Sequence, residues 1–229
     1  MRRFFLWARA RPGEWALLAA LLACYPLSLV LPPEWGRENG ILENLQVLAL
    51  VCGCVLALVV FVRLRPARLA MLALWVAPVW LLLAARELSW GRAWRASPGL
   101  DAAGRALPAD PLWFQPLVWP GAALLVGWLV WSAWHYRLDE VMRMALARRT
   151  PWLVILVALG GALGSTCAEG HMSCSLDMLA SRAQVFEELV ELLAYLALCS
   201  VQAVVLAQRA PCRRARTAHP VEAHAEQAG

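Results

Sequence analysis

The sequence predicts an all-α, polytopic membrane protein: a bundle of about six transmembrane helices with both termini in the cytoplasm. Composition gives the first indication, because the 229 residues are 61% hydrophobic and only 16% charged, with a mean hydropathy of +0.57. Apolar residues make up only roughly half of a soluble domain. Their arrangement gives the second, because they form long continuous runs that lack the alternation of barrel strands.

Six runs are long enough to cross a bilayer, which requires about 20 mainly apolar residues. They are residues 15–31, 41–62, 69–88, 117–134, 152–168 and 185–207. All six are expected to be helices, because lipid offers no hydrogen-bond partners and each segment must satisfy its own backbone N–H and C=O groups. We expect residues 1–209 to form one transmembrane domain, and the polar residues 210–229 to form a disordered cytoplasmic tail.

Each span is bordered or marked by particular residues. The first follows four arginines and continues to residue 31, beyond the length of a signal-peptide core. The second begins near Glu43 and the third ends near Glu87. The fourth carries Trp119 near its start and Trp134 at its end, and tryptophan is typical of the membrane interface. The fifth contains the small residues of the segment 160–164, which permit close helix packing, and the sixth carries polar residues on one face.

The positions of arginine predict the orientation. All 21 cationic residues are arginine, and 15 of them fall in residues 2–11, 63–68, 137–149 and 209–216. The alternation of six spans places these four segments on one side of the membrane. Because basic loop residues are retained in the cytoplasm, that side and both termini are predicted to be cytoplasmic. Arginines that interrupt apolar runs do not form the single basic face of a nucleic-acid-binding protein, so we expect no nucleic-acid partner.

Four spans place a carboxylate at the same predicted depth. Glu43, Glu87, Glu169 and Glu191 each lie 18 to 20 residues from the arginine that borders the cytoplasmic end of their span. At the rise of an α-helix this separation is roughly 27 to 30 Å, which reaches the outer boundary of the hydrocarbon core. The sequence therefore predicts a layer of carboxylates at the extracytoplasmic end of the bundle.

The last span carries a polar face. Its members follow helical steps of four, three, four and seven residues, and are Gln184, Glu188, Glu191, Tyr195 and Gln202. Such a face must be turned to protein or water. Glu187 and Glu191 are also like charges one helical turn apart, which repel each other. Compensation is expected from a shared proton, from an arginine such as Arg86 or Arg182, or from a bound cation.

These residues predict a site that opens to the extracytoplasmic side and binds a divalent cation or a cationic lipid headgroup. The candidate cofactor is a divalent metal with Glu87, Glu191 and His171 as ligands, because carboxylates with one imidazole suit several metals. Residues expected to contact a bound ligand are Glu43, Gln46, Arg86, Glu188 and Tyr195. Glu169 and Glu187 rank lower because they are more easily solvated.

Whether the protein is an enzyme is left open. If it is, Glu87 and Glu191 are the candidate catalytic base and acid, and processing of an envelope lipid is the expected reaction class. A transporter or ion-conducting subunit is an alternative, with Glu191, Tyr195 and Gln202 in a polar path. A scaffold or assembly partner is another, in which the acids only pair with arginines or reach water. The expected partner is the lipid bilayer, and the oligomeric state is open.

Two further features concern the predicted outer ends of the last two spans. Cys167 and Cys174 belong to the same side of the membrane, where an oxidising compartment would allow a disulfide between them. Ser165 follows the glycines of the fifth span and is interpreted as a packing residue.

Three short blocks resemble blocks in bacterial multi-pass membrane proteins of uncharacterised function. They are residues 43–46 (Glu-Asn-Leu-Gln), 86–91 (Arg-Glu-Leu-Ser-Trp-Gly) and 187–191 (Glu-Glu-Leu-Val-Glu). The related proteins have a Glu-x-Ser-Trp-Gly element at the end of one span and a Glu-rich start to the last span. They carry a further acid before that element, where this chain has Arg86. The resemblance implies a bacterial inner-membrane protein and implies no activity.

Overall fold

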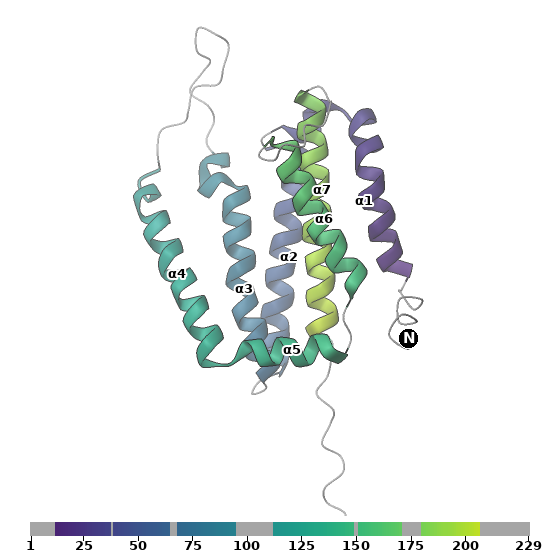
Figure 1. The fold of residues 1–229 in the computed structure, drawn as a ribbon. Helices are drawn as coiled ribbons and strands as arrows, with labels where there is room; N and C mark the ends of the chain where they lie inside the picture. Colours follow the sequence, from purple (N-terminus) through teal and green to yellow (C-terminus); the bar gives the residue numbers. More distant parts are fainter. Residues whose placement is uncertain are drawn as a thin grey trace, which may run out of the picture.

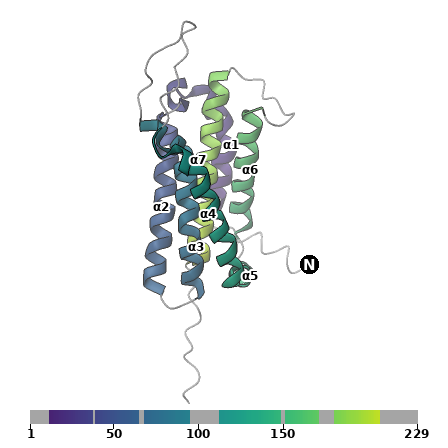
Figure 2. The same cartoon turned by 90° about the vertical axis from the view of Figure 1, so that its left-hand side faces the viewer.

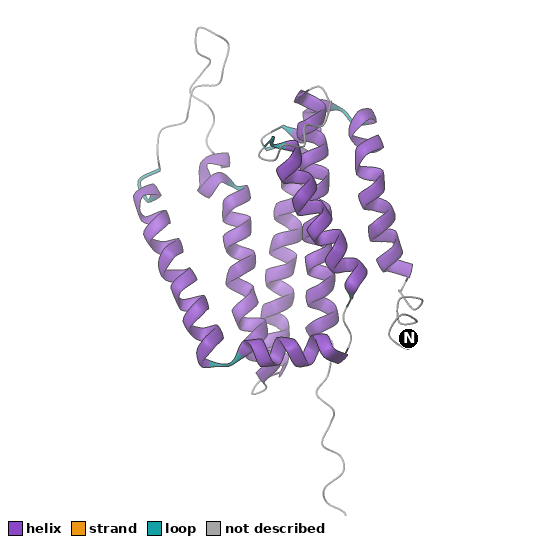
Figure 3. Cartoon of the chain, in the orientation of Figure 1, coloured by secondary structure: helices purple, strands orange, loops and turns teal. Residues whose placement is uncertain are grey.

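The computed structural model describes residues 12–37, 39–64, 68–94, 112–148, 151–170 and 180–206. Within these ranges the chain forms seven α-helices and two short 3-10 segments and contains no strand (Figure 3). The predicted all-α, polytopic fold is therefore confirmed.

A helix overlaps each of the six predicted spans. These helices are α1 (Pro12–Val30), α2 (Ile41–Leu64), α3 (Arg68–Glu87), α4 (Gln115–His135), α6 (Trp152–Ala168) and α7 (Ala180–Leu206). Of the described helices, all of these except α6 are long and apolar enough to cross a membrane. Helix α6 is equally apolar, but its 17 residues put it at the short end of the range for a span. The protein is thus a membrane protein built from apolar helices.

The long helices run roughly side by side and alternate in direction (Figures 1 and 2). Helix α7 contacts α1, α2 and α6, while α3 packs on α2 and α4 packs on α3 at the edge of the bundle. Helices α2 and α7 begin, and α3 and α6 end, at the upper end in Figure 1. We call this the carboxylate end. Glu43 and Glu87 lie in the terminal turns of α2 and α3, Glu169 directly follows α6, and Glu191 lies about three turns into α7. Helix α1 begins and α7 ends at the opposite end.

Helix α5 (Leu138–Arg148) lies across that opposite end of the bundle, and sequence analysis missed it (Figure 1). Its apolar side chains Leu138 and Val141 are buried against Leu72 of α3 and Val205 of α7. Its other face is charged, with pairs such as Asp139 and Arg143. An amphipathic helix of this kind suits the interface between membrane and water. From the sequence, this segment was predicted only to be an arginine-bearing connection.

Close packing between helices depends on glycine at two positions. A Cβ atom on Gly161 of α6 would lie 2.6 Å from the backbone oxygen of Val190 in α7, and one on Gly53 of α2 would lie 2.8 Å from the Trp80 ring of α3. Both distances are shorter than a van der Waals contact, so these helices could not approach as closely with a larger residue. The close packing expected of the fifth span is confirmed at Gly161.

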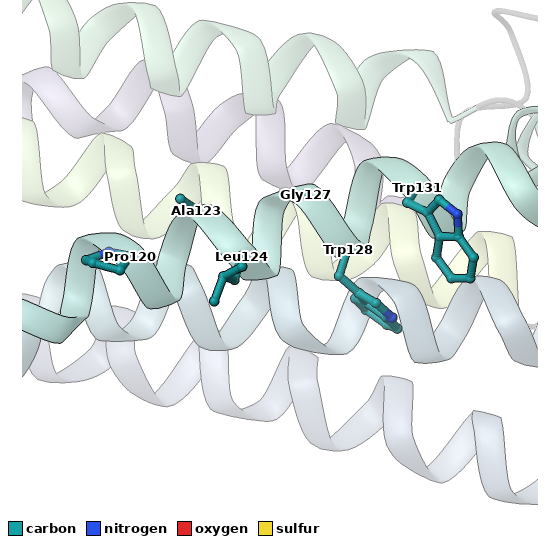
Figure 4. A pocket seen from close by; sticks show the side chains of 6 residues that line it. All are labelled: Pro120, Ala123, Leu124, Gly127, Trp128 and Trp131. Atoms are coloured by element: carbon teal, nitrogen blue, oxygen red, sulfur yellow. The ribbon is translucent and has the colours of Figure 1, made fainter.

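Helix α4 presents an apolar face to the outside of the bundle. An open hollow of about 690 Å³ lies along it and is lined by Pro120, Ala123, Leu124, Gly127, Trp128 and Trp131 (Figure 4). Every lining residue belongs to α4 and is apolar or aromatic, which suits contact with lipid chains. On its other side α4 is fastened to α3, where the Trp75 indole N–H donates to the Leu129 carbonyl at 2.8 Å.

Candidate cation site at the carboxylate end

Three carboxylates converge between the end of α6 and the part of α7 that lies about two to three turns after its start. Glu169, Glu187 and Glu191 each offer an oxygen, and these oxygens lie within 4.8 Å of one another. Two oxygens bound to one Ca²⁺ ion can be at most about 5 Å apart, because each metal–oxygen bond is about 2.3–2.6 Å. We call these residues the carboxylate trio. Glu169 is exposed, and the other two are half-buried, so the trio is accessible from the end of the bundle.

The carboxylate of Glu191 is held in place from two other helices. Ser165 of α6 is buried and donates its hydroxyl hydrogen to Glu191 Oε1 at 2.7 Å. The Arg86 guanidinium of α3 lies 3.5 Å from the same oxygen. Packing was the only role that the sequence indicated for Ser165, and this hydrogen bond was not predicted. The signal was its position one turn after Gly161 and one turn before Glu169, on the face of α6 that meets α7.

Glu87 lies apart from the trio and has different partners. The Tyr195 hydroxyl of α7 donates to Glu87 Oε1 at 2.8 Å. Arg86 Nε is 3.7 Å from that same oxygen. Arg86 therefore bridges Glu87 and Glu191 and links α3 to α7 through charge. Tyr195, which was expected to contact a ligand, is engaged with Glu87 in the structure.

A second polar contact joins α2 to α7. The Gln46 side-chain amide donates to the Glu188 carboxylate at 2.7 Å and to the Glu188 backbone oxygen at 2.9 Å. Gln46 has an exposed fraction of 0%. Its Oε1 atom is buried and accepts no hydrogen bond from any described residue.

Glu43 helps to start α2. Its carboxylate accepts a hydrogen bond from the backbone N–H of Asn39, which precedes the helix. This contact ties the first turn of α2 to the chain that precedes it, one residue further out than the contact of a capping box. Glu43 also interacts electrostatically with Glu87 and Glu188, so it lies near both polar contacts.

The remaining predicted features have other outcomes. His171, the expected imidazole ligand, and Cys174 lie outside the described residues. Cys167 is disulfide-bonded, and its pairing with Cys174 stays a prediction. Arg182 does not compensate a carboxylate within the described ranges. Its guanidinium donates to the backbone oxygens of Ser28 and Leu31, where it caps the end of α1.

Further along α7, Gln202 forms a separate buried contact. It accepts a hydrogen bond from the Trp80 indole N–H of α3 and donates to the Gly53 backbone oxygen of α2 at 2.9 Å. Gln202 is 11 residues beyond Glu191, which places it roughly 16 Å deeper along the helix. It therefore joins three helices within the apolar part of the bundle.

Comparison with known proteins does not identify a family for this chain. No protein-family model, curated protein or solved structure matches this chain.

Proposed function

We propose that this chain is a bacterial inner-membrane protein that binds a divalent cation through Glu169, Glu187 and Glu191. The observation that carries the proposal is the convergence of these three carboxylates, from two helices, on a space that one ion would fill. Carboxylate oxygens are the ligands that hard divalent cations such as Ca²⁺, Mg²⁺ and Mn²⁺ prefer. His171 is a further candidate ligand from the predicted set.

The charge balance around Glu191 supports the same proposal. Arg86 is shared by Glu87 and Glu191, so one guanidinium faces two carboxylates. Glu187 adds a third negative group beside Glu191. Like charges this close repel strongly where the dielectric is below that of water. A divalent cation would offset that repulsion.

The orientation belongs to the proposal as well. The arginine distribution favours a cytoplasmic location for both termini and for α5. The carboxylate end is opposite α5 and would then face the periplasm. Catalysis by Glu87 and Glu191, and with it the processing of an envelope lipid, stays a prediction. Of these two residues only Glu191 belongs to the trio.

The test begins with dialysis of the detergent-purified protein against a chelator. The protein is then titrated with Mn²⁺, and electron paramagnetic resonance measures the Mn²⁺ that is bound. We expect one Mn²⁺ per chain at the trio and a loss of affinity of about 10-fold or more in each of Glu169→Gln, Glu187→Gln and Glu191→Gln. Glu140→Gln, at the opposite end, is the matched control and should bind as the wild type does. Equal binding in wild type and Glu169→Gln would contradict the proposal.

A cationic lipid headgroup is the second candidate ligand, favoured by the exposure of Glu169 at the end of the bundle. Native mass spectrometry of the protein in mixtures of phosphatidylethanolamine and phosphatidylglycerol distinguishes a bound headgroup from a bound metal. Preferential retention of phosphatidylethanolamine, lost in Glu169→Gln and unaffected by Mn²⁺, would favour the headgroup. Displacement of retained lipid by Mn²⁺ would favour the metal.

A further inference from the structure

Gln46 carries a buried oxygen that the polar contacts at the carboxylate end do not satisfy. The side chain is fully buried, and Oε1 accepts no hydrogen bond from the described part of the chain. Native proteins pair most buried polar atoms, because an unsatisfied one costs about 1–3 kcal/mol. This oxygen therefore requires a hydrogen-bond donor or a cation as its partner.

The orientation of the amide follows from its neighbours. Its nitrogen donates to two oxygens of Glu188, the carboxylate and the backbone carbonyl. Reversing the amide would point its oxygen at those two acceptors, which would repel it. The unsatisfied atom is therefore the oxygen. It lies within about 5 Å of the Glu188 carboxylate, since the two ends of an amide are only about 2.3 Å apart.

Several carboxyl groups lie near this oxygen. Glu188 interacts electrostatically with Glu191 and Glu43, and more weakly with Glu187 and Glu87. An amide oxygen beside carboxylates is an oxygen ligand set of the kind that Ca²⁺ takes from glutamine and glutamate side chains. The full burial of Gln46 excludes a lipid headgroup, so the partner of this oxygen must be as small as a water molecule or a single ion.

We infer that the Gln46 amide oxygen and the Glu188 carboxylate hold a second divalent cation, on the α2 side of the carboxylate trio. Glu43, which interacts with Glu188 and sits one turn before Gln46 on α2, is a further ligand candidate. The inference rests on the proposed function, in that the carboxylate end binds cations. It adds a buried position to an accessible one, so that the protein binds two ions rather than one.

Two substitutions at Gln46 distinguish a ligand from a structural residue. Gln46→Leu removes both the oxygen and the N–H donors, whereas Gln46→Glu removes the donors and keeps an oxygen. A ligand role predicts two Mn²⁺ per chain in the wild type, one in Gln46→Leu, and two in Gln46→Glu with the second bound at least as tightly. A purely structural role predicts that both variants lose thermal stability and that neither changes the Mn²⁺ count.

Glu169→Gln, measured beside them, separates this inference from the proposed function. Loss of Mn²⁺ in Glu169→Gln with no change in Gln46→Leu would overturn the inner site and leave the trio. Loss in Gln46→Leu with no change in Glu169→Gln would overturn the trio and support the inner site. No Mn²⁺ bound to the wild type would overturn both. Thermal unfolding of each variant, with and without Mn²⁺, shows that the protein counted is folded.

Discussion

Substitution of Gly161 by alanine should separate α6 from α7 and weaken both stability and cation binding. The added Cβ would lie 2.6 Å from the Val190 backbone oxygen and 2.9 Å from the Ala194 Cβ. Both contacts are with backbone or a rigid methyl group, so no flexible side chain can move away. The two helices must shift apart by several tenths of an ångström to restore normal contact distances.

Gly164 provides the matched control on the same helix. A Cβ there would meet Val190 methyl groups at 3.6 and 3.7 Å, an ordinary contact. Alanine gains about 1 kcal/mol over glycine in a helix, and this gain is common to both substitutions. Overpacking of a close contact costs about 1–3 kcal/mol. Gly161→Ala should therefore be about 1–3 kcal/mol less stable than Gly164→Ala, whatever the shared gain is in a membrane.

The assay is reversible unfolding in mixed micelles, with Mn²⁺ titration of the same samples. Because Glu169 directly follows α6 and Glu191 lies on α7, a wider separation should also raise the Kd for Mn²⁺ in Gly161→Ala. The Kd should be unchanged in Gly164→Ala. Equal stability of the two variants would refute the packing argument. A stability difference without any change in Mn²⁺ affinity would show that the trio does not depend on the close approach of α6 and α7.

Two other buried or capping contacts should be measurable by the same unfolding assay. Gln202→Leu leaves the buried Trp80 indole N–H without its acceptor and should cost about 1–3 kcal/mol, whereas an unchanged stability would mean that this contact is not formed. Arg182→Met removes the donor that caps α1 and should cost about 1 kcal/mol. Asp139→Asn breaks only an exposed pair with Arg143 on α5 and should change stability by no more than about 0.5 kcal/mol, so a larger loss would argue that α5 is held by charge.

Most of the fold follows from hydropathy because lipid restricts what a long apolar run can do. A segment such as 41–62 has no alternative to a helix in a bilayer, so its structure is fixed before any tertiary contact forms. Helix α5 lacks that constraint, because its 11 residues include Asp139, Glu140 and Arg143. Such a sequence is also typical of a polar connection between spans. Its signal was the spacing of Leu138 and Val141, which lie three residues apart on one face.

The sequence predicted the depth at which the carboxylates of the site lie. It did not predict which of them are neighbours in the plane of the membrane. Counting residues along each span places Glu87, Glu169 and Glu191 near one level, because the rise of a helix is constant. Which of these carboxylates come together depends on which helices are neighbours. Hydropathy does not predict the order of helices around a bundle. The contact of α6 with α7 brings Glu169 to Glu191, whereas Glu87 on α3 meets Tyr195. Glu169 and Glu187, the less favoured candidates from the sequence, are therefore the carboxylates that lie close to Glu191.

The polar face of α7 bears on whether an ion could pass through the bundle. Beyond Tyr195 its next polar member is Gln202, whose amide is already bonded to Trp80 and Gly53. Below Gln202 the described neighbours form an apolar cluster that includes Leu72, Val141 and Val205. An ion leaving Gln202 would meet no oxygen ligand in that cluster and would pay the full cost of desolvation. Polar groups that converge at one end and stop at an apolar layer favour an ion that is held over an ion that is conducted.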